Sequence, residues 1–191
     1  MKRHFNTHLE GLDIEFWRNL MVSRGRLVTY GKGEYLCRKG EPTNFCGYVK
    51  SGYLIYRMSA VSKQPDIGGF AFADAFCGDY PNCMYNQPAV FDLVTGRKSE
   101  VWTLDATILP QLYKEHIEYS EHGRAFMESA YNSLLRRYYS LCANTPTERY
   151  IELIREHPHV EQEVSQAEIA KYLHISPIHL CRIRKSLLIG L

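Results

Sequence analysis

The sequence feature that most constrains the fold is the C-terminal stretch of residues 165–191. Ser165 followed by Glu168 has the spacing of a capping box, in which each side chain accepts a hydrogen bond from the other residue's backbone N–H. Ser176 followed by Pro177 begins a second helix, with serine as N-cap and proline in the first turn. Two short helices joined by a tight turn predict a helix-turn-helix.

Three further positions fit this motif. Ala170 falls where the two helices approach most closely, and a small side chain is needed there. Ile175 and Leu180 are spaced to fill the angle between the helices. His174 lies in the turn, where the backbone is often left-handed, and histidine is one of the few residues besides glycine that tolerate a positive φ. An ordinary packed helical hairpin with a basic exposed face is the alternative interpretation.

The charge pattern favours a nucleic-acid partner for this stretch. The formal net charge of the whole chain is only +2 at pH 7, so a general attraction to nucleic acid is not the signal. The signal is local, because residues 171–191 contain no acidic residue and the acidic residues lie before them. The basic residues of this segment are Lys171, Arg182, Arg184 and Lys185.

Residues 26–104 have a different pattern, in which short runs of aromatic and β-branched residues alternate with glycines. The runs predict strands at residues 26–30, 34–38, 45–50, 53–58 and 99–104. We interpret the pair Gly68-Gly69 as one of the turn signals between them. Many short strands with frequent turns predict an antiparallel sandwich or roll.

Helical periodicity precedes and follows the β-rich region. One amphipathic helix is predicted over residues 8–23, another around residues 109–116, and a longer one over residues 120–143. A 3.5-residue repeat in the long helix is typical of paired helices, so we expect its members to form a homodimer contact, with packing onto the β-rich region as the alternative. The members are Met127, Tyr131, Leu134, Tyr138 and Leu141. A capped helix over residues 145–156 follows, after a hinge at residues 144–146.

The order of these parts resembles the CRP/FNR superfamily of transcription regulators. Lys-Gly-Glu at 32–34, Lys-Gly-Glu-Pro at 39–42 and Val-Lys-Ser-Gly at 49–52 are similar to the glycine-marked turns of that family's β-roll. Thr-Glu-Arg-Tyr at 147–150 and residues 165–185 are similar to its C-terminal domain. The resemblance covers nearly the whole chain.

The resemblance implies an α+β fold in three parts. These are a cyclic-nucleotide-binding-like antiparallel β-roll at 1–119, a dimerisation helix and hinge at 120–144, and a helix-turn-helix DNA-binding domain at 145–191. It also implies a homodimeric, non-enzymatic regulator that binds a palindromic double-stranded DNA operator, with RNA polymerase as a further partner. The N-terminus has no long apolar region typical of a secretory signal, so we expect a cytoplasmic protein. No apolar run approaches membrane-spanning length. Few residues follow Lys185, so we expect no full β-hairpin wing and a grip on DNA by the helices alone.

The resemblance also implies roles for single residues of the helix-turn-helix. Pro177, Ile178 and Arg182 match the family positions that most often face bases. Arg182 is expected to bridge the two acceptors of a guanine, and Ile178 to contact a thymine methyl. The residues expected to contact phosphate, which sets register without reading sequence, are Gln166, Ser176, His179 and Lys185.

The β-roll departs from the family pattern at the nucleotide site. Cyclic-nucleotide-binding members carry a Gly-Glu pair and an Arg-Ser/Thr-Ala segment, whereas this chain has Gly78-Asp79 and Gln87-Pro88-Ala89. Without an arginine the phosphate would lack its bidentate cation, so we expect no tight binding of cyclic AMP, no cofactor and an effector of unknown identity. Candidate effector-pocket residues, with core packing as the alternative for the aromatic ones, are Phe70, Phe72, Phe76, Gly78, Asp79, Tyr80 and Gln87.

Other function classes are less well supported by the sequence. A cupin-like enzyme would need metal ligands on the strands of the roll, and residues 26–104 contain no histidine. A ligand-binding β-roll whose helical C-terminal domain docks a protein partner stays open, although the basic bias of residues 171–191 argues against it.

The cysteines predict neither a disulfide framework nor a metal site. No C-x-x-C pair occurs, and no cysteine precedes Cys37, where an oxygen-sensing relative would carry its iron–sulfur ligands. In a reducing compartment most of them are expected to be small buried apolar residues. They are Cys37, Cys46, Cys77, Cys83, Cys142 and Cys181.

Overall fold

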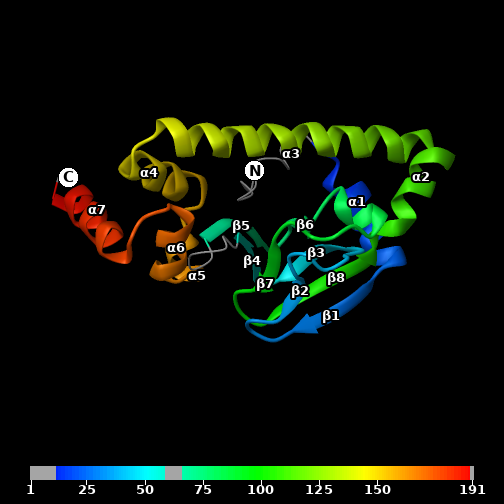
Figure 1. The fold of residues 1–191 in the computed structure, drawn as a ribbon, viewed down its shortest axis with the longest axis horizontal. Coiled ribbons are helices and arrows are strands. Elements are labelled where there is room, and N and C mark those ends of the chain that lie inside the picture. The colour runs from blue at the N-terminus through cyan, green and yellow to red at the C-terminus, as the bar shows by residue number, and fades with distance from the viewer. Residues whose placement is uncertain (1–11, 59–65, 190–191) are drawn as a thin grey trace.

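A computed structural model describes residues 12–58 and 66–189. Figure 1 shows a β-rich N-terminal part, one long helix that runs along its side, and a group of short helices at the far end of that helix. The strands are β1 (Arg26–Tyr30), β2 (Tyr35–Cys37), β3 (Phe45–Ser51), β4 (Tyr53–Met58), β5 (Asp66–Phe72), β6 (Phe76–Gly78), β7 (Asp92–Thr95) and β8 (Ser99–Asp105). The α-helices are α1 (Ile14–Arg24), α2 (Leu109–Glu115), α3 (Ile117–Ala143), α4 (Pro146–Glu156), α5 (Val160–Glu163), α6 (Gln166–Tyr172) and α7 (Pro177–Ile189).

The strands form two four-stranded antiparallel sheets that make a β-roll. One sheet has the order β1-β8-β3-β6 and the other β2-β7-β4-β5. The hairpin between β3 and β4 turns at Gly52, whose φ of +86° lies in the left-handed region that glycine adopts most easily. A side chain at Gly52 would also collide with Ser99, so the turn needs glycine on both counts. The predicted α+β class with an antiparallel roll is confirmed.

Two hydrophobic clusters hold the molecule together. The first, which we call the roll core, lies between the two sheets and under α1 and α2, and it includes Val49, Leu54 and Val101, each fully buried. The second, which we call the bridging cluster, joins Phe70 and its neighbours on β4 and β5 to Leu173 and its neighbours on the C-terminal helices. The C-terminal helices are therefore packed directly against the roll.

The predicted elements agree with the structure best where their signals are local. The strands predicted at 26–30 and 53–58 are β1 and β4, with the same bounds. The interpretation of Gly68-Gly69 as a turn is wrong, because both glycines lie inside β5. A side chain at Gly68 would strike Met58 on the paired strand, so the glycine makes room for that methionine.

The first helix begins later than predicted. The Asp13 side chain accepts a hydrogen bond of 2.9 Å from the Phe16 N–H and caps α1, which therefore starts at Ile14. The earlier residues of the predicted helix, 8–11, lie outside the described residues. The long helix begins at Ile117, three residues before the predicted start, and ends at Ala143 as expected.

Candidate nucleic-acid interface and ligand cavities

The helix-turn-helix begins with the predicted capping box. The Ser165 backbone N–H donates to Glu168 Oε2 at 3.0 Å, and the Glu168 backbone N–H donates to Ser165 Oγ at 3.3 Å. The second helix is capped by Ser176, whose Oγ accepts from the His179 N–H at 3.2 Å. Both predicted N-caps are confirmed, and they fix where α6 and α7 start.

The turn between α6 and α7 has the expected geometry. His174 has a φ of +54°, so it does occupy the left-handed region. The Ile175 N–H donates to the Ala170 carbonyl at 3.0 Å, which draws the turn back onto α6. Ala170 is fully buried and Leu180 is 1% exposed, as the close approach of the two helices requires.

The outward face of this motif carries all seven predicted DNA-contact residues. Each of them is exposed, and Ile178 is 68% exposed although it is a large apolar residue. Among the described residues, neither Arg182 nor Lys185 has an acidic partner, so both charges are available to a polyanion. The set on this face is Gln166, Ser176, Pro177, Ile178, His179, Arg182 and Lys185.

Arg184 behaves differently from Arg182, two residues away on the same helix. Its Nε lies 3.1 Å from Glu161 Oε1, and the same oxygen accepts the Tyr150 hydroxyl at 2.8 Å. This arrangement ties α7 to α4 and α5. The sequence shows both arginines in one basic run, and only the structure separates the anchored one from the available one.

The long helix presents apolar residues that are exposed in the described part of the chain. Of the five residues in the predicted dimer seam, Tyr131, Leu134 and Tyr138 are 60%, 67% and 61% exposed. Met127 and Leu141 are half-buried. Tyr139, which the 3.5-residue repeat does not include, is 62% exposed beside them. Large exposed apolar patches of this kind are typical of protein–protein contacts.

The seven predicted effector-pocket residues do not come together in one pocket. Phe70 and Phe72 lie in the bridging cluster, where the Phe70 ring is 5.6 Å from that of Tyr172 on α6. The two phenylalanines therefore pack against the C-terminal helices. This is the core-packing role that we gave as the alternative for the aromatic residues.

Asp79 and Gln87 lie outside the bridging cluster, in the loops that follow β6. Asp79 is 3% exposed, and its Oδ2 accepts the Val90 N–H at 2.7 Å. Gln87 is exposed, and its amide donates to the Tyr85 carbonyl at 3.2 Å. The Asp79 carboxylate is thus committed to holding its own loop. The remaining three residues, Phe76, Gly78 and Tyr80, line a cavity described below.

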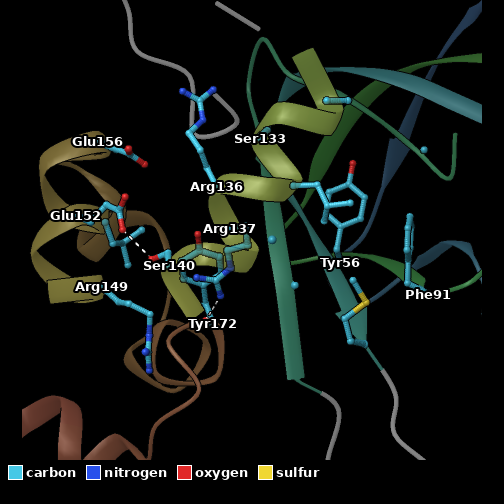
Figure 2. A pocket seen from close by; sticks show the side chains of 17 residues that line it. Tyr56, Phe91, Ser133, Arg136, Arg137, Ser140, Arg149, Glu152, Glu156 and Tyr172 are labelled. Atoms are coloured by element: carbon cyan, nitrogen blue, oxygen red, sulfur yellow. Dashed lines mark hydrogen bonds between the residues drawn. The ribbon is translucent and has the colours of Figure 1, made fainter. Parts of the chain in front are cut away.

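A first cavity, of about 340 Å³, lies between the roll, α3, α4 and the end of α6. Figure 2 shows Tyr56 and Phe91 at one side of it, and Glu152, Glu156 and Arg149 at the other. We call it the charged cavity, since three arginines and two glutamates line it.

Two of its arginines are structural. Arg149 donates to the Leu173 carbonyl at 3.0 Å and to the Asn144 carbonyl at 2.6 Å, and Arg137 donates to the Tyr172 carbonyl while its guanidinium lies 3.8 Å from the Tyr172 ring centroid. Burial, and the neighbouring Arg149, lower the pKa of Arg137. These cations bond the carbonyls at the end of α6 and join it to α3 and α4, a role that no pattern in the sequence indicates.

A second cavity, of about 310 Å³, lies under α1, α2 and the middle of α3. We call it the apolar cavity. Four residues, Tyr56, Gly78, Ala130 and Leu134, line both this cavity and the charged cavity, so the two cavities are adjacent.

The cysteines and the other potential metal ligands form no cluster in the described part of the chain. Four thiols are buried, and those of Cys142 and Cys181 are exposed. Within residues 12–58 and 66–189, no group of three or more His, Cys, Asp or Glu side chains is placed to hold a metal ion. No helix in that part of the chain has both the length and the apolar content to cross a membrane.

Solved structures with the same fold cover most of the chain. FixK2 from Bradyrhizobium japonicum has a TM-score of 0.76 at 15% identity, over 87% of this chain and 85% of that one. The c-di-GMP-responsive global regulator CLP of Xanthomonas campestris has a TM-score of 0.67 at 16% identity, over 93% of both chains. A CooA mutant from Carboxydothermus hydrogenoformans has a TM-score of 0.69 at 14% identity, over 87% of this chain and 77% of that one. The chain therefore has a CRP/FNR-type fold.

Comparison by sequence adds nothing to this result. No protein-family model matches the chain, and no curated protein does.

Proposed function

We propose that the protein is a sequence-specific, homodimeric DNA-binding transcription regulator, without catalytic activity. One observation carries the proposal. The outward face of α7 leaves Arg182 and Lys185 exposed and without acidic partners among residues 12–58 and 66–189, while the caps and the turn before α7 fix that face at the surface. A recognition helix of this kind enters the major groove with its exposed side chains toward the bases.

Dimerisation supplies the second half of the recognition. The exposed apolar residues of α3 would pair with those of a second copy, because one short helix buries too little surface for specific binding at physiological salt. A two-fold dimer reads a palindrome whose half-sites are about 34 Å apart. RNA polymerase is the further partner that such a regulator would contact.

The comparisons support this function at the level of the fold. CLP is described as a global regulator that acts on virulence gene expression and responds to c-di-GMP. In this chain the segment at residues 87–89 has no arginine, and Asp79 is already bonded to the loop at Val90. We therefore extend the regulatory role to this chain but not the response to a cyclic nucleotide.

The test is a selection on a randomised duplex library, read by fluorescence anisotropy at two salt concentrations. Arg182→Ala should weaken binding of the selected site by about 1–3 kcal/mol and relax the preference at one base pair. Arg184→Ala is the matched control, because Arg184 is paired with Glu161. It should change affinity far less and leave the preference intact.

Two results would contradict the proposal. If Arg182→Ala weakens all sequences equally, Arg182 contacts phosphate and reads no base. If the wild-type chain binds no duplex even at low salt, the alternative of a helical domain that docks a protein partner is favoured.

A further inference from the structure

The walls of the apolar cavity carry no charge. None of the described residues that line it is Asp, Glu, Lys, Arg or His. Its ionisable groups are tyrosines and cysteines, and burial raises the pKa of Tyr80, of Tyr113 and of the Cys77 thiol. These three groups therefore stay neutral at physiological pH. An ionised ligand would lose its hydration here and gain no counter-charge.

The polar groups in the cavity lining are few. The Tyr80 and Tyr113 hydroxyls bond each other, and the Cys46 thiol is directed to the Leu104 carbonyl at 3.6 Å. The Trp17 Nε1–H is buried and has no hydrogen-bond partner among the described residues. The lining therefore offers a ligand few polar partners and favours a mostly apolar molecule.

Aromatic rings make up much of the surface. The rings of Trp17, Phe76 and Tyr80 each lie 6.1–6.2 Å from that of Phe126, edge to face. Aromatic molecules pack against such an arrangement through their own edges and faces. An engineered apolar cavity of about 150 Å³ binds benzene, and the volume here, about 310 Å³, is about twice that. The volume thus fits two fused rings.

The cavity also adjoins the surface expected to pair two copies. Met127, Tyr131 and Leu134 line it, and all three belong to the predicted dimer seam of α3. A ligand that contacts these residues binds better to one position of α3 than to another. It therefore shifts the population of protein molecules toward the position that it binds better.

We propose that the apolar cavity is the effector site, and that its ligand is an uncharged aromatic molecule of about two fused rings. The regulatory meaning of this site rests on the proposed function, whereas binding itself does not. Nucleotides, carboxylates and other anions are excluded from the cavity by its lack of counter-charge.

The experiment measures ligand binding to the full chain without DNA. Isothermal titration and thermal shift compare 2-naphthol, naphthalene, 2-naphthoate and cyclic AMP. We expect the two neutral compounds to bind and to raise the melting temperature, and the two anions to do neither. Tight binding of 2-naphthoate or of cyclic AMP, or no binding of either neutral compound, overturns the proposal.

Variants locate the site. Ala130→Leu fills the cavity and should abolish binding. Asn132→Leu places the same side chain on an exposed position of α3 outside the cavity and should not. Equal affinities in Ala130→Leu and Asn132→Leu would overturn the proposal.

Two further outcomes separate this proposal from others. If 2-naphthol binds only to a monomeric Tyr138→Glu chain, in which the changed seam residue lies outside the cavity lining, a second copy covers the cavity and the ligand site is refuted. If the neutral ligands bind as expected but the protein binds no DNA, the site stands and the proposed function fails. If both hold, 2-naphthol should change the DNA affinity of the wild type and not that of Ala130→Leu.

Discussion

The roll core and the bridging cluster are built from the same kinds of residue and serve different purposes. The roll core is closed within the N-terminal part, between two sheets whose facing residues are fully buried. The bridging cluster uses the other face of β4 and β5, and it is completed only when Leu173 and its neighbours on the C-terminal helices cover it.

The difference teaches how the two ends of the chain depend on each other. The roll core is made by residues of the N-terminal part alone. The outer face of β4 and β5, in contrast, is covered by the C-terminal helices. Polar contacts surround the bridging cluster, among them the Tyr53 hydroxyl to Glu168 at 3.3 Å and Arg97 to Glu163 at 3.2 Å. The position of α6 and α7 is thus tied to the surface of the roll.

The largest expected effect comes from removing the central ring of the bridging cluster. Phe70→Ala should cost about 3–5 kcal/mol, since Phe70 is fully buried and packs against Tyr172. Hydrogen exchange should show lost protection in α6 and α7 while β3 and β8 stay protected. Leu54→Ala in the roll core is the control, and it should expose both parts at once at a cost of about 2–5 kcal/mol. Identical exchange patterns for the two variants would mean that the clusters form one cooperative unit.

A smaller effect is expected at the cap of α6. Ser165→Ala should cost about 1 kcal/mol, because it removes an N-cap. Glu168 Oε2 bonds both Ser165 and the Tyr53 hydroxyl, so Ser165→Ala and Tyr53→Phe should be non-additive in urea unfolding. Thr145→Ala removes the equivalent cap of α4. Within the described chain, Thr145 and Glu148 bond only each other and not the roll, so the change should add to Tyr53→Phe within about 0.5 kcal/mol. Additivity in both pairs would mean that the α6 cap and the roll contact are independent.

These contrasts also explain which parts the sequence could predict. The capping boxes of α4 and α6 and the left-handed turn at His174 were predictable, because each depends on residues within a few positions of one another. The pairing of β5 was not, because Gly68-Gly69 has the composition of a turn, and only the Met58 side chain on the neighbouring strand explains the glycine.

The candidate sites divide in the same way. The exposed face of α7 follows from helical spacing, so all seven predicted contact residues are at the surface. The effector residues depend on which element covers each face of a sheet, and that is decided far away in the sequence. Phe70 and Phe72 share a face of β5 and meet the C-terminal helices, whereas Phe76 meets Phe126 of α3.

The ion pair at the rim of the bridging cluster should contribute little. Arg97 and Glu163 have side chains that are 49% and 36% exposed, so Arg97→Ala should cost about 0–1 kcal/mol and less at high salt. Lys98→Ala is the control, since Lys98 is an exposed neighbour with no partner in the described chain. A salt-independent loss above this range would show that Arg97 contributes mainly through its position over the Tyr53 ring, 5.6 Å away.

The smallest effect concerns the pH dependence of the contact between the turn and β5. His174 Nδ1 lies 3.6 Å from Asp66, which favours the protonated ring, but burial, Arg137 and Arg149 outweigh it and lower the pKa of His174. The unfolded chain then binds more protons than the folded one, so this group's contribution to stability is lost as the pH falls below about 6.5. His174→Asn keeps a residue that tolerates positive φ and does not titrate. Urea unfolding at pH 7 and pH 5 should show a smaller loss of stability for the variant than for the wild type. A larger loss for the variant would mean that the Asp66 ion pair prevails, so that acid strengthens the bond between the roll and the helix-turn-helix.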